Sequence, residues 1–440
     1  MIENTNLTAP SAALGLVASE FPRECGVLKD VECVAALGAM PALMRVGSAA
    51  AQAAPTGRGG HALKRLALAA HPQAVCNDGS TAAYFYRKAS SHPKSWLVYL
   101  EGAGICYDET SCTRRCSSRS NPLCSSHTWR SSQQVDGFLR ASSSDLGGAH
   151  KVLVRYCSSD AFLGNSSAFG LQFRGQAIIE AVFSELVGTH GLGRARKPGR
   201  QRDTVVFGGS SSGAYGAMAH LDFVPRMLGA SAAANVRVVG FLDAALTLMP
   251  PWQPADGEKR LRLGQREKLM DSYLHSTRHG DACTSSLPQG SDQRFKCLLA
   301  LYRLRHLNTP FLLVASQFDT AQVATLLSSA LGERPQGKNE EDVVQQFAKR
   351  HVREALKVQS AAAQRNVSVG LFMPACFDHA TAGSENGFQY VRHSLDGESM
   401  QGALLKLMNP RTARQSSLTF VDQCEGFACG SCPSSAADSG

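Results

Sequence analysis

One serine stands in a sequence context that could make it a nucleophile. Ser211 is the centre of the pentad Gly209-x-Ser211-x-Gly213. The pentad lies between the apolar run 204–207 and a helix-compatible segment, 214–228. This is the pattern of a nucleophile elbow, in which glycines flank the serine because the turn between strand and helix leaves little room for side chains. The sequence therefore predicts nucleophilic catalysis by Ser211.

A serine hydroxyl near neutral pH needs a general base, and histidine is the usual one. In enzymes with this elbow the base follows the serine in the chain. His379 comes just after the last strong strand pattern, where catalytic loops lie, and it is the predicted base; His393 is the alternative. His220 lies on the expected elbow helix and cannot turn back, and His351 is expected to face solvent in a charged helical stretch.

The base in turn needs a carboxylate that orients its ring. Two aspartates follow the carboxyl ends of apolar runs: Asp319 after the run 311–314, and Asp243 after the run 236–242. Both would lie at the edge of a sheet where catalytic loops gather. The residues alone favour Asp319 but leave Asp243 open.

The negative charge that develops on an ester carbonyl needs preorganised N–H donors. The residue after the nucleophile, Ser212, is predicted to supply one backbone N–H. A glycine-bearing loop follows the early apolar run 96–100, and its residues Ala103 and Gly104 are the candidates for the others. A simple tight turn is the alternative interpretation of this loop.

Apolar runs with many β-branched residues recur along the chain and alternate with helical spacing. Runs of this kind are typical of strands buried on both faces. The helical spacing falls at 176–186 and 340–358. Alternating strands and helices predict an α/β fold, a mostly parallel sheet with helices on both faces. The runs are 96–100, 152–156, 204–207, 236–242, 311–314 and 367–372.

The chain is expected to have three parts. Residues 1–73 are rich in Ala and Gly, with helix-like patches at 31–44 and 61–70, and are interpreted as an N-terminal extension. Residues 74–412 form the predicted catalytic domain, in which 245–310 is a cap-like excursion between two strands. Residues 413–440 are a tail that contains cysteines.

Composition excludes several classes of protein. The chain is 43% hydrophobic, which excludes general disorder, and no run of about 18 apolar residues predicts a membrane span. The net charge of +9 is mild for 440 residues, and no aromatic residues interleave with the densest basic run, 194–202, so nucleic acid is not an expected partner. The predicted chemistry needs neither a metal ion nor an organic cofactor.

The fourteen cysteines indicate an oxidising compartment. A zinc site would need paired C-x2-C spacings, and only Cys429-Gly430-Ser431-Cys432 has that form. Three N-x-[ST] sequons, at Asn6, Asn165 and Asn366, are candidate glycosylation sites. Secretion, or residence in the secretory pathway or cell wall, is therefore expected, although residues 1–13 lack the basic segment of an ordinary signal peptide.

Seven motifs follow one another along the chain: Cys76–Ser80, Trp96–Gly102, Cys106 with Cys112, Tyr156–Asp160, Gly209–Gly213, Phe318–Gln322 and Cys376–His379. Taken together and in this order, they resemble the pectin acetylesterase/Notum family over about residues 74–395. The resemblance implies an α/β-hydrolase-like esterase with Ser211, Asp319 and His379 as its catalytic triad, which decides for Asp319 over Asp243.

The resemblance also implies disulfides Cys76–Cys157 and Cys106–Cys112, with Cys297 and Cys376 at further family cysteine positions. One departure concerns the oxyanion loop. The family usually has Gly-Gly-Trp there, or Gly-Gly-Gly-Trp in plants, whereas residues 102–105 are Gly-Ala-Gly-Ile. The missing tryptophan alters the expected wall of the pocket and thereby the substrate.

The expected function is hydrolysis of acyl esters, most simply acetyl esters on a polysaccharide such as pectin, by a monomer. One alternative keeps the machinery and removes a longer fatty acyl group from a protein, as Notum does. A second alternative is a non-catalytic binding module on the same fold, which an intact Ser/Asp/His set disfavours.

Overall fold

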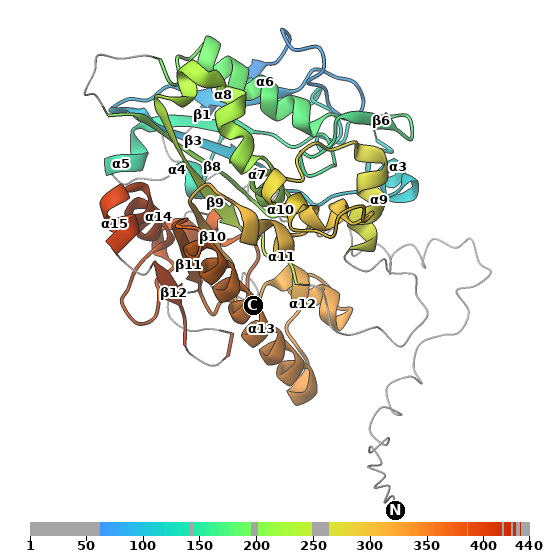
Figure 1. Cartoon of the computed structure of the whole chain (residues 1–440). Helices are drawn as coiled ribbons and strands as arrows, with labels where there is room; N and C mark the ends of the chain where they lie inside the picture. Colours follow the sequence, from blue (N-terminus) through green and yellow to red (C-terminus); the bar gives the residue numbers. More distant parts are fainter. Residues whose placement is uncertain are drawn as a thin grey trace, which may run out of the picture. The chain divides into compact units, whose positions relative to one another are not determined.

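The computed structural model describes residues 62–118, 120–140, 144–194, 201–248, 264–384, 386–415, 418–423, 426–427 and 432. The helical patch predicted at 31–44 and the sequon at Asn6 lie outside these residues. A ten-stranded sheet in the order β12-β11-β10-β9-β8-β3-β5-β2-β1-β4 organises them (Figure 1). Neighbours from β12 to β5 pair in parallel, and those from β5 to β4 are antiparallel.

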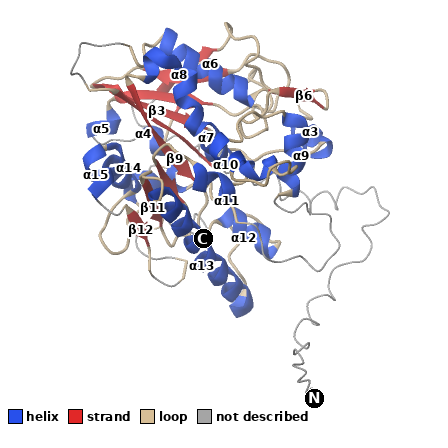
Figure 2. Cartoon of the chain, viewed as in Figure 1, coloured by secondary structure: helices blue, strands red, loops and turns tan. Residues whose placement is uncertain are grey.

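The six apolar runs all form strands at the centre of this sheet, as the sequence predicted. Each is covered on both faces, which is why its side chains are apolar at consecutive positions and do not alternate. Helices lie on both faces of the sheet (Figure 2). The predicted α/β-hydrolase-like class is therefore correct. The strands are β3 (His92–Leu100), β5 (Ala149–Val154), β8 (Asp203–Ser210), β9 (Val236–Asp243), β10 (Phe311–Val314) and β11 (Val369–Met373).

The helical interpretation of residues 61–70 is wrong. This segment contains the strand β1 (Ala62–Ala67), which pairs with β2 (Ala83–Arg87) and β4 (Ser132–Gln134). Hydrogen bonds to two neighbouring strands outweigh the weak helical preference of a short alanine-containing segment. At the other edge, β12 (Thr419–Val421) pairs with β11, so the sheet extends beyond 74–412 on both sides.

The helices predicted at 176–186 and 340–358 are present as α6 and α13, each slightly longer than its pattern. The α-helices are α3 (Glu109–Arg115), α4 (Gly137–Arg140), α5 (Ser144–Gly147), α6 (Gly175–Gly188), α7 (Ser212–His220), α8 (Val224–Ala233), α9 (Gln265–Leu274), α10 (Asp281–Ser285), α11 (Ala300–Arg303), α12 (Thr320–Leu327), α13 (Gly337–Ala363), α14 (Met400–Met408) and α15 (Pro410–Gln415). Short 3-10 turns are η2 (Leu221–Phe223), η3 (Arg294–Leu298), η4 (Leu304–His306) and η5 (Thr381–Gly383), and η6 (Asn386–Tyr390) is a π-helix. None of the described helices is long and apolar enough to cross a membrane.

The chain leaves the sheet between β9 and β10, where the cap-like excursion was predicted. Its described part contains α9, α10, η3, α11 and η4. Helix α11 packs on α7, and α9 packs on a hairpin formed by β6 (Ser166–Ala168) and β7 (Leu171–Phe173). Tyr273 of α9 contacts the rings of Phe169 and Phe173 in that hairpin. The excursion is thus joined to both the elbow helix and the loop after β5.

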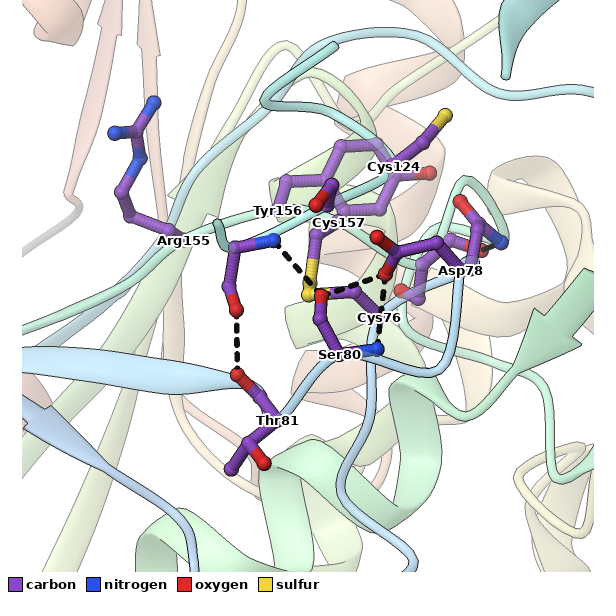
Figure 3. Close-up of a disulfide and its surroundings, with 12 residues drawn as sticks. Cys76, Asp78, Ser80, Thr81, Cys124, Arg155, Tyr156 and Cys157 are labelled. Carbon is purple, nitrogen blue, oxygen red and sulfur yellow. Dashed lines mark hydrogen bonds between the residues drawn. A yellow bond between two sulfur atoms is a disulfide. The ribbon is translucent and has the colours of Figure 1, made fainter. Parts of the chain in front are cut away.

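Five disulfides connect the described cysteines. Cys76–Cys157 joins the segment before β2 to the loop after β5, beside the hydrogen bonds of Ser80 with Asp78 (Figure 3). Cys106–Cys112 also forms, so both pairings implied by the resemblance are present in the structure. The partners that the sequence left unassigned complete the set: Cys116–Cys124, Cys283–Cys297 and Cys376–Cys432.

Truncation of Leu63 to alanine tests whether β1 belongs to the folded domain. Leu63 is fully buried, so Leu63→Ala is expected to lower the free energy of unfolding by roughly 2–5 kcal/mol. The neighbouring Lys64 points to solvent, and Lys64→Ala should change it by less than about 0.5 kcal/mol. Denaturant unfolding measures the free energy of unfolding of both variants. If the two variants were equally stable, residues 62–67 would be a peripheral extension and not part of the folded domain.

Candidate active site

Ser211 occupies the tight turn between β8 and α7. Its backbone has φ 54° and ψ −124°, a conformation that L-residues rarely adopt and that lifts the side chain out of the helix. The flanking glycines are required by space. A Cβ atom on Gly213 would lie 2.2 Å from the carbonyl oxygen of Leu100, and one on Gly209 would lie 2.6 Å from that oxygen. The pentad pattern thus reflects packing of the elbow against the end of β3.

Three predicted side chains lie in line at the carboxyl ends of their strands. His379 Nε2 is 2.9 Å from Ser211 Oγ, and His379 Nδ1 is 2.8 Å from Asp319 Oδ2. Asp319 also caps helix α12, because its Oδ1 accepts a hydrogen bond from the Gln322 N–H at 3.0 Å. An imidazole that donates through Nδ1 to the carboxylate presents its Nε2 lone pair to the serine hydroxyl.

Burial and charge have opposite effects on the histidine. Burial alone would lower the pKa of His379, but the carboxylate of Asp319 outweighs it and raises that pKa to about 9, with smaller contributions from Asp243 and Asp378. Burial likewise would raise the pKa of Asp319, but the charge and hydrogen bond of His379 hold it below its usual value. Each partner therefore favours the charged form of the other.

Asp243, the alternative acid, has different hydrogen-bond partners from Asp319. Its Oδ2 accepts hydrogen bonds from Ser210 Oγ at 2.6 Å and from the Ala382 N–H at 3.0 Å. Its backbone oxygen accepts the Ser211 N–H at 2.9 Å. Asp243 therefore ties the elbow to the loop that carries His379, and burial raises its pKa to about 7.

The other candidate histidines have partners elsewhere. His393 bonds Asp396 and the Val421 carbonyl, and His220 bonds the Phe162 carbonyl. The expectation that His351 faces solvent is wrong. It is fully buried, and its Nε2 lies 3.1 Å from the Leu246 oxygen. His351 lies on the apolar face of the long amphipathic helix α13, so it points into the core although its sequence neighbours are charged.

The oxyanion loop differs in one respect from the prediction. The Ala103 N–H donates to Ser212 Oγ at 2.9 Å, so it already has an acceptor. Within the described part of the chain, neither the Gly104 N–H nor the Ser212 N–H has one. Ser212 is the first residue of α7, where backbone N–H groups have no partner inside the helix. Gly104 and Ser212 are therefore the available donors of the three.

The sequence analysis assigned no role to Gln322, whose backbone N–H donates to Asp319 Oδ1 and whose side chain binds the segment after β9. Its side chain donates to the Leu246 oxygen at 3.0 Å and accepts from the Leu248 N–H at 2.8 Å. It thereby joins the helix capped by Asp319 to the first residues after β9. Gln322 lies three residues after Asp319 in a motif that carried the resemblance, which was the one signal available.

The described residues contain no cluster of three or more His, Cys, Asp or Glu side chains that could hold a metal ion.

The two candidate glycosylation sites within the described residues lie outside the group formed by Ser211, His379 and Asp319. Asn165 and Asn366 are both exposed, as glycosylation would require. Asn165 begins the β6–β7 hairpin region, and Asn366 follows α13.

Comparison with known proteins is decisive about the family. The model of the family named Pectinacetylesterase matches residues 58–432. The chain belongs to the pectinacetylesterase family of carboxylic-ester hydrolases. Its fold is that of a Notum structure: the crystal structure of the Wnt deacylase Notum from Drosophila matches with a TM-score of 0.69 and 26% identity, covering 85% of this chain and 100% of that one.

The sequence relatives include a pectin acetylesterase and palmitoleoyl-protein carboxylesterases named NOTUM. Pectin acetylesterase 5 of Arabidopsis thaliana is 27% identical over 338 residues, which are 72% of this chain and 73% of that protein. The palmitoleoyl-protein carboxylesterase NOTUM of Drosophila melanogaster is 31% identical over 281 residues, 61% of this chain. The chain spans 39% of that relative's length and 47% of the corresponding Schmidtea mediterranea protein, which is 28% identical.

Two substitutions at Asp243 separate its charge from its hydrogen bonds. Both bonds end on one oxygen, so Asp243→Asn can keep them while it removes a negative charge that raises the pKa of His379. The protonated imidazole cannot accept the serine proton, so fluorophosphonate labelling of Ser211 should rise with pH through the histidine pKa. In Asp243→Asn the midpoint of this rise should move to lower pH.

Asp243→Ala should instead lower stability, because it leaves two buried donors unpaired at about 1–3 kcal/mol each. The exposed Asp342 provides the control, since Asp342→Asn should alter neither the midpoint nor the stability. An unchanged midpoint in Asp243→Asn would show that this carboxylate has no influence on His379.

Proposed function

We propose that this chain is a serine carboxylesterase that removes acyl groups, most simply acetyl, from a polysaccharide such as pectin. The observation that supports it is the continuous hydrogen-bonded line from Ser211 through His379 to Asp319. Family membership supports ester hydrolysis, and the match to a plant pectin acetylesterase over 73% of its length supports the acetyl ester.

In the proposed mechanism Ser211 Oγ attacks the ester carbonyl while its proton passes to His379 Nε2. Asp319 holds the ring with Nδ1–H toward the carboxylate and stabilises the imidazolium that forms. The tetrahedral intermediate collapses as His379 returns the proton to the departing alkoxide, which leaves an acyl-serine. Water then attacks the acyl-serine with His379 as base, releasing the acid and restoring the serine. The sum is one ester and one water converted to one alcohol and one acid.

Removal of a fatty acyl group from a protein is the second candidate. It is favoured by the match to the Drosophila Notum structure, which this chain covers completely. Residues 102–105 lack the tryptophan that the family usually has in this loop, and Ile105 packs half-buried against the core. A smaller side chain there reshapes the wall beside the oxyanion loop, so the two candidates differ in the acyl chain that the site accepts.

We further propose that the protein works outside the cytosol. Five disulfides among the described cysteines are typical of an oxidising compartment, and the two exposed sequons are compatible with passage through a secretory pathway.

Ser211→Ala tests the proposed reaction directly. Hydrolysis of p-nitrophenyl acetate by the wild type should fall at least about 1,000-fold in this variant, because the acyl-serine cannot form. Ser210→Ala is the matched comparison: it removes the neighbouring hydroxyl, which bonds Asp243, but leaves the Ser211 hydroxyl beside His379, so this variant should keep far more activity than Ser211→Ala. Equal rates for wild type and Ser211→Ala, or failure of a fluorophosphonate to label Ser211, would favour a binding module.

A series of p-nitrophenyl esters from acetate to octanoate decides between the two substrates. An acetylesterase should show kcat/KM falling steadily as the acyl chain lengthens, since a short pocket excludes longer chains. A steep preference for eight carbons would instead support the fatty deacylase. Acetate release from acetylated pectin, xylan and chitin oligomers then identifies the polysaccharide, and release from none of the three would contradict the proposed substrate class.

A further inference from the structure

A buried guanidinium lies behind the oxyanion loop. Arg115, the last residue of α3, is only 6% exposed, and its Nη2 donates to the Ala103 carbonyl oxygen at 2.7 Å. Its charge faces the ring of Tyr156, 5.6 Å from the ring centre. Burial lowers the pKa of this guanidinium, and among the described residues only Tyr156, and no carboxylate, acts electrostatically on that pKa. A buried cation without a counter-ion costs several kcal/mol, so its retention calls for a compensating role.

Arg115 is held rigidly. Disulfides bracket its short helix, because Cys106 before the helix bonds Cys112 within it, and Cys116 after the helix bonds Cys124. The backbone oxygen of Arg115 also accepts a hydrogen bond from Asn121 Nδ2 at 2.6 Å. The backbone of Arg115 is therefore held in place where its guanidinium contacts the loop, unlike that of a mobile surface arginine.

The bond to Ala103 determines the direction of the next amide. The Ala103 carbonyl and the Gly104 N–H belong to one peptide unit, and the described chain has no cis peptide bonds. In a trans peptide these two groups point in opposite directions, so a carbonyl fixed on Arg115 turns the Gly104 N–H away from it. That N–H has no acceptor among the described residues, and the loop abuts the elbow, where a Cβ on Gly102 would lie 3.1 Å from Ser211 Cβ.

We propose that Arg115 is a positioning residue for catalysis: through the Ala103 carbonyl it fixes and polarises the Gly104 N–H as an oxyanion donor. The inference rests on the proposed function, since it concerns the same ester carbonyl. A cation bonded to the oxygen of a peptide withdraws electron density from it and makes its N–H a stronger donor, because hydrogen bonds in a chain polarise one another. The buried positive charge also favours the anion that develops on the substrate.

The test compares an ester with its thionoester, phenyl acetate and O-phenyl thionoacetate. Sulfur is a weak hydrogen-bond acceptor, so a thionoester gains less from the oxyanion donors. Arg115→Met should lower kcat/KM for the ester by about 100-fold and that for the thionoester by a smaller factor, so that their ratio falls about tenfold or more. The control is Arg114→Met, an exposed arginine on the same helix, which should leave both values unchanged.

If Arg115 had only a structural role, Arg115→Met would lower kcat/KM by the same factor for the ester and for the thionoester. An unchanged ester-to-thionoester ratio would therefore overturn the proposal. If Arg115→Met does not fold by circular dichroism, Arg115→Lys decides. Lysine keeps the charge but lacks the planar, branched donor group of arginine, so the ester-to-thionoester ratio should still fall below its wild-type value, and again an unchanged ratio overturns the proposal. Wild-type activity that does not depend on Ser211 would overturn the proposed function instead, so the two failures are distinguishable.

Discussion

The hydrogen bond between buried Asp319 and His379 is the interaction on which the arrangement of the site depends. A carboxylate taken out of water is costly unless its lone pairs are satisfied, and here His379 and the Gln322 N–H satisfy them. The imidazole in turn is fixed in the one orientation that directs Nε2 at Ser211. The loop after β11, the start of α12 and the elbow must therefore all stay in register, because a shift in any of them would leave a charge buried and unpaired.

The parallel sheet is what makes this register attainable. β8, β10 and β11 run in the same direction, so the loops that follow them emerge at the same edge and bring residues from distant parts of the chain together. Asp243, at the end of β9 between them, adds a second link by bonding both Ser210 and Ala382. Two buried carboxylates thus hold one histidine loop, one by orienting the ring and the other by fixing the backbone.

Three disulfides secure segments on the oxyanion-loop side of the site. Cys106–Cys112 and Cys116–Cys124 secure a helix of one or two turns that could not be stable alone. Cys76–Cys157 secures the loop after β5 against the segment before β2. The loop that carries His379 has both kinds of support, because it follows β11 and is tied by Cys376–Cys432, whereas α3 and the loop before it lie outside the sheet and depend on covalent support.

The sequence by itself predicted the central elements of the fold and membership of an esterase family. Continuous apolar runs predicted the six central strands, and the glycine-flanked serine predicted the elbow, because both are local patterns that sterics and burial impose directly. It failed at β1, where cross-strand hydrogen bonds overrode local preference, and at His351, whose burial depends on which face of α13 meets the core. The family resemblance already favoured Asp319 over Asp243, but only the tertiary structure showed which groups Asp243 binds, gave the Ala103 N–H an acceptor and placed Arg115 behind the loop. Each of these is a contact between residues far apart in the chain, and no local pattern carries the distance between them.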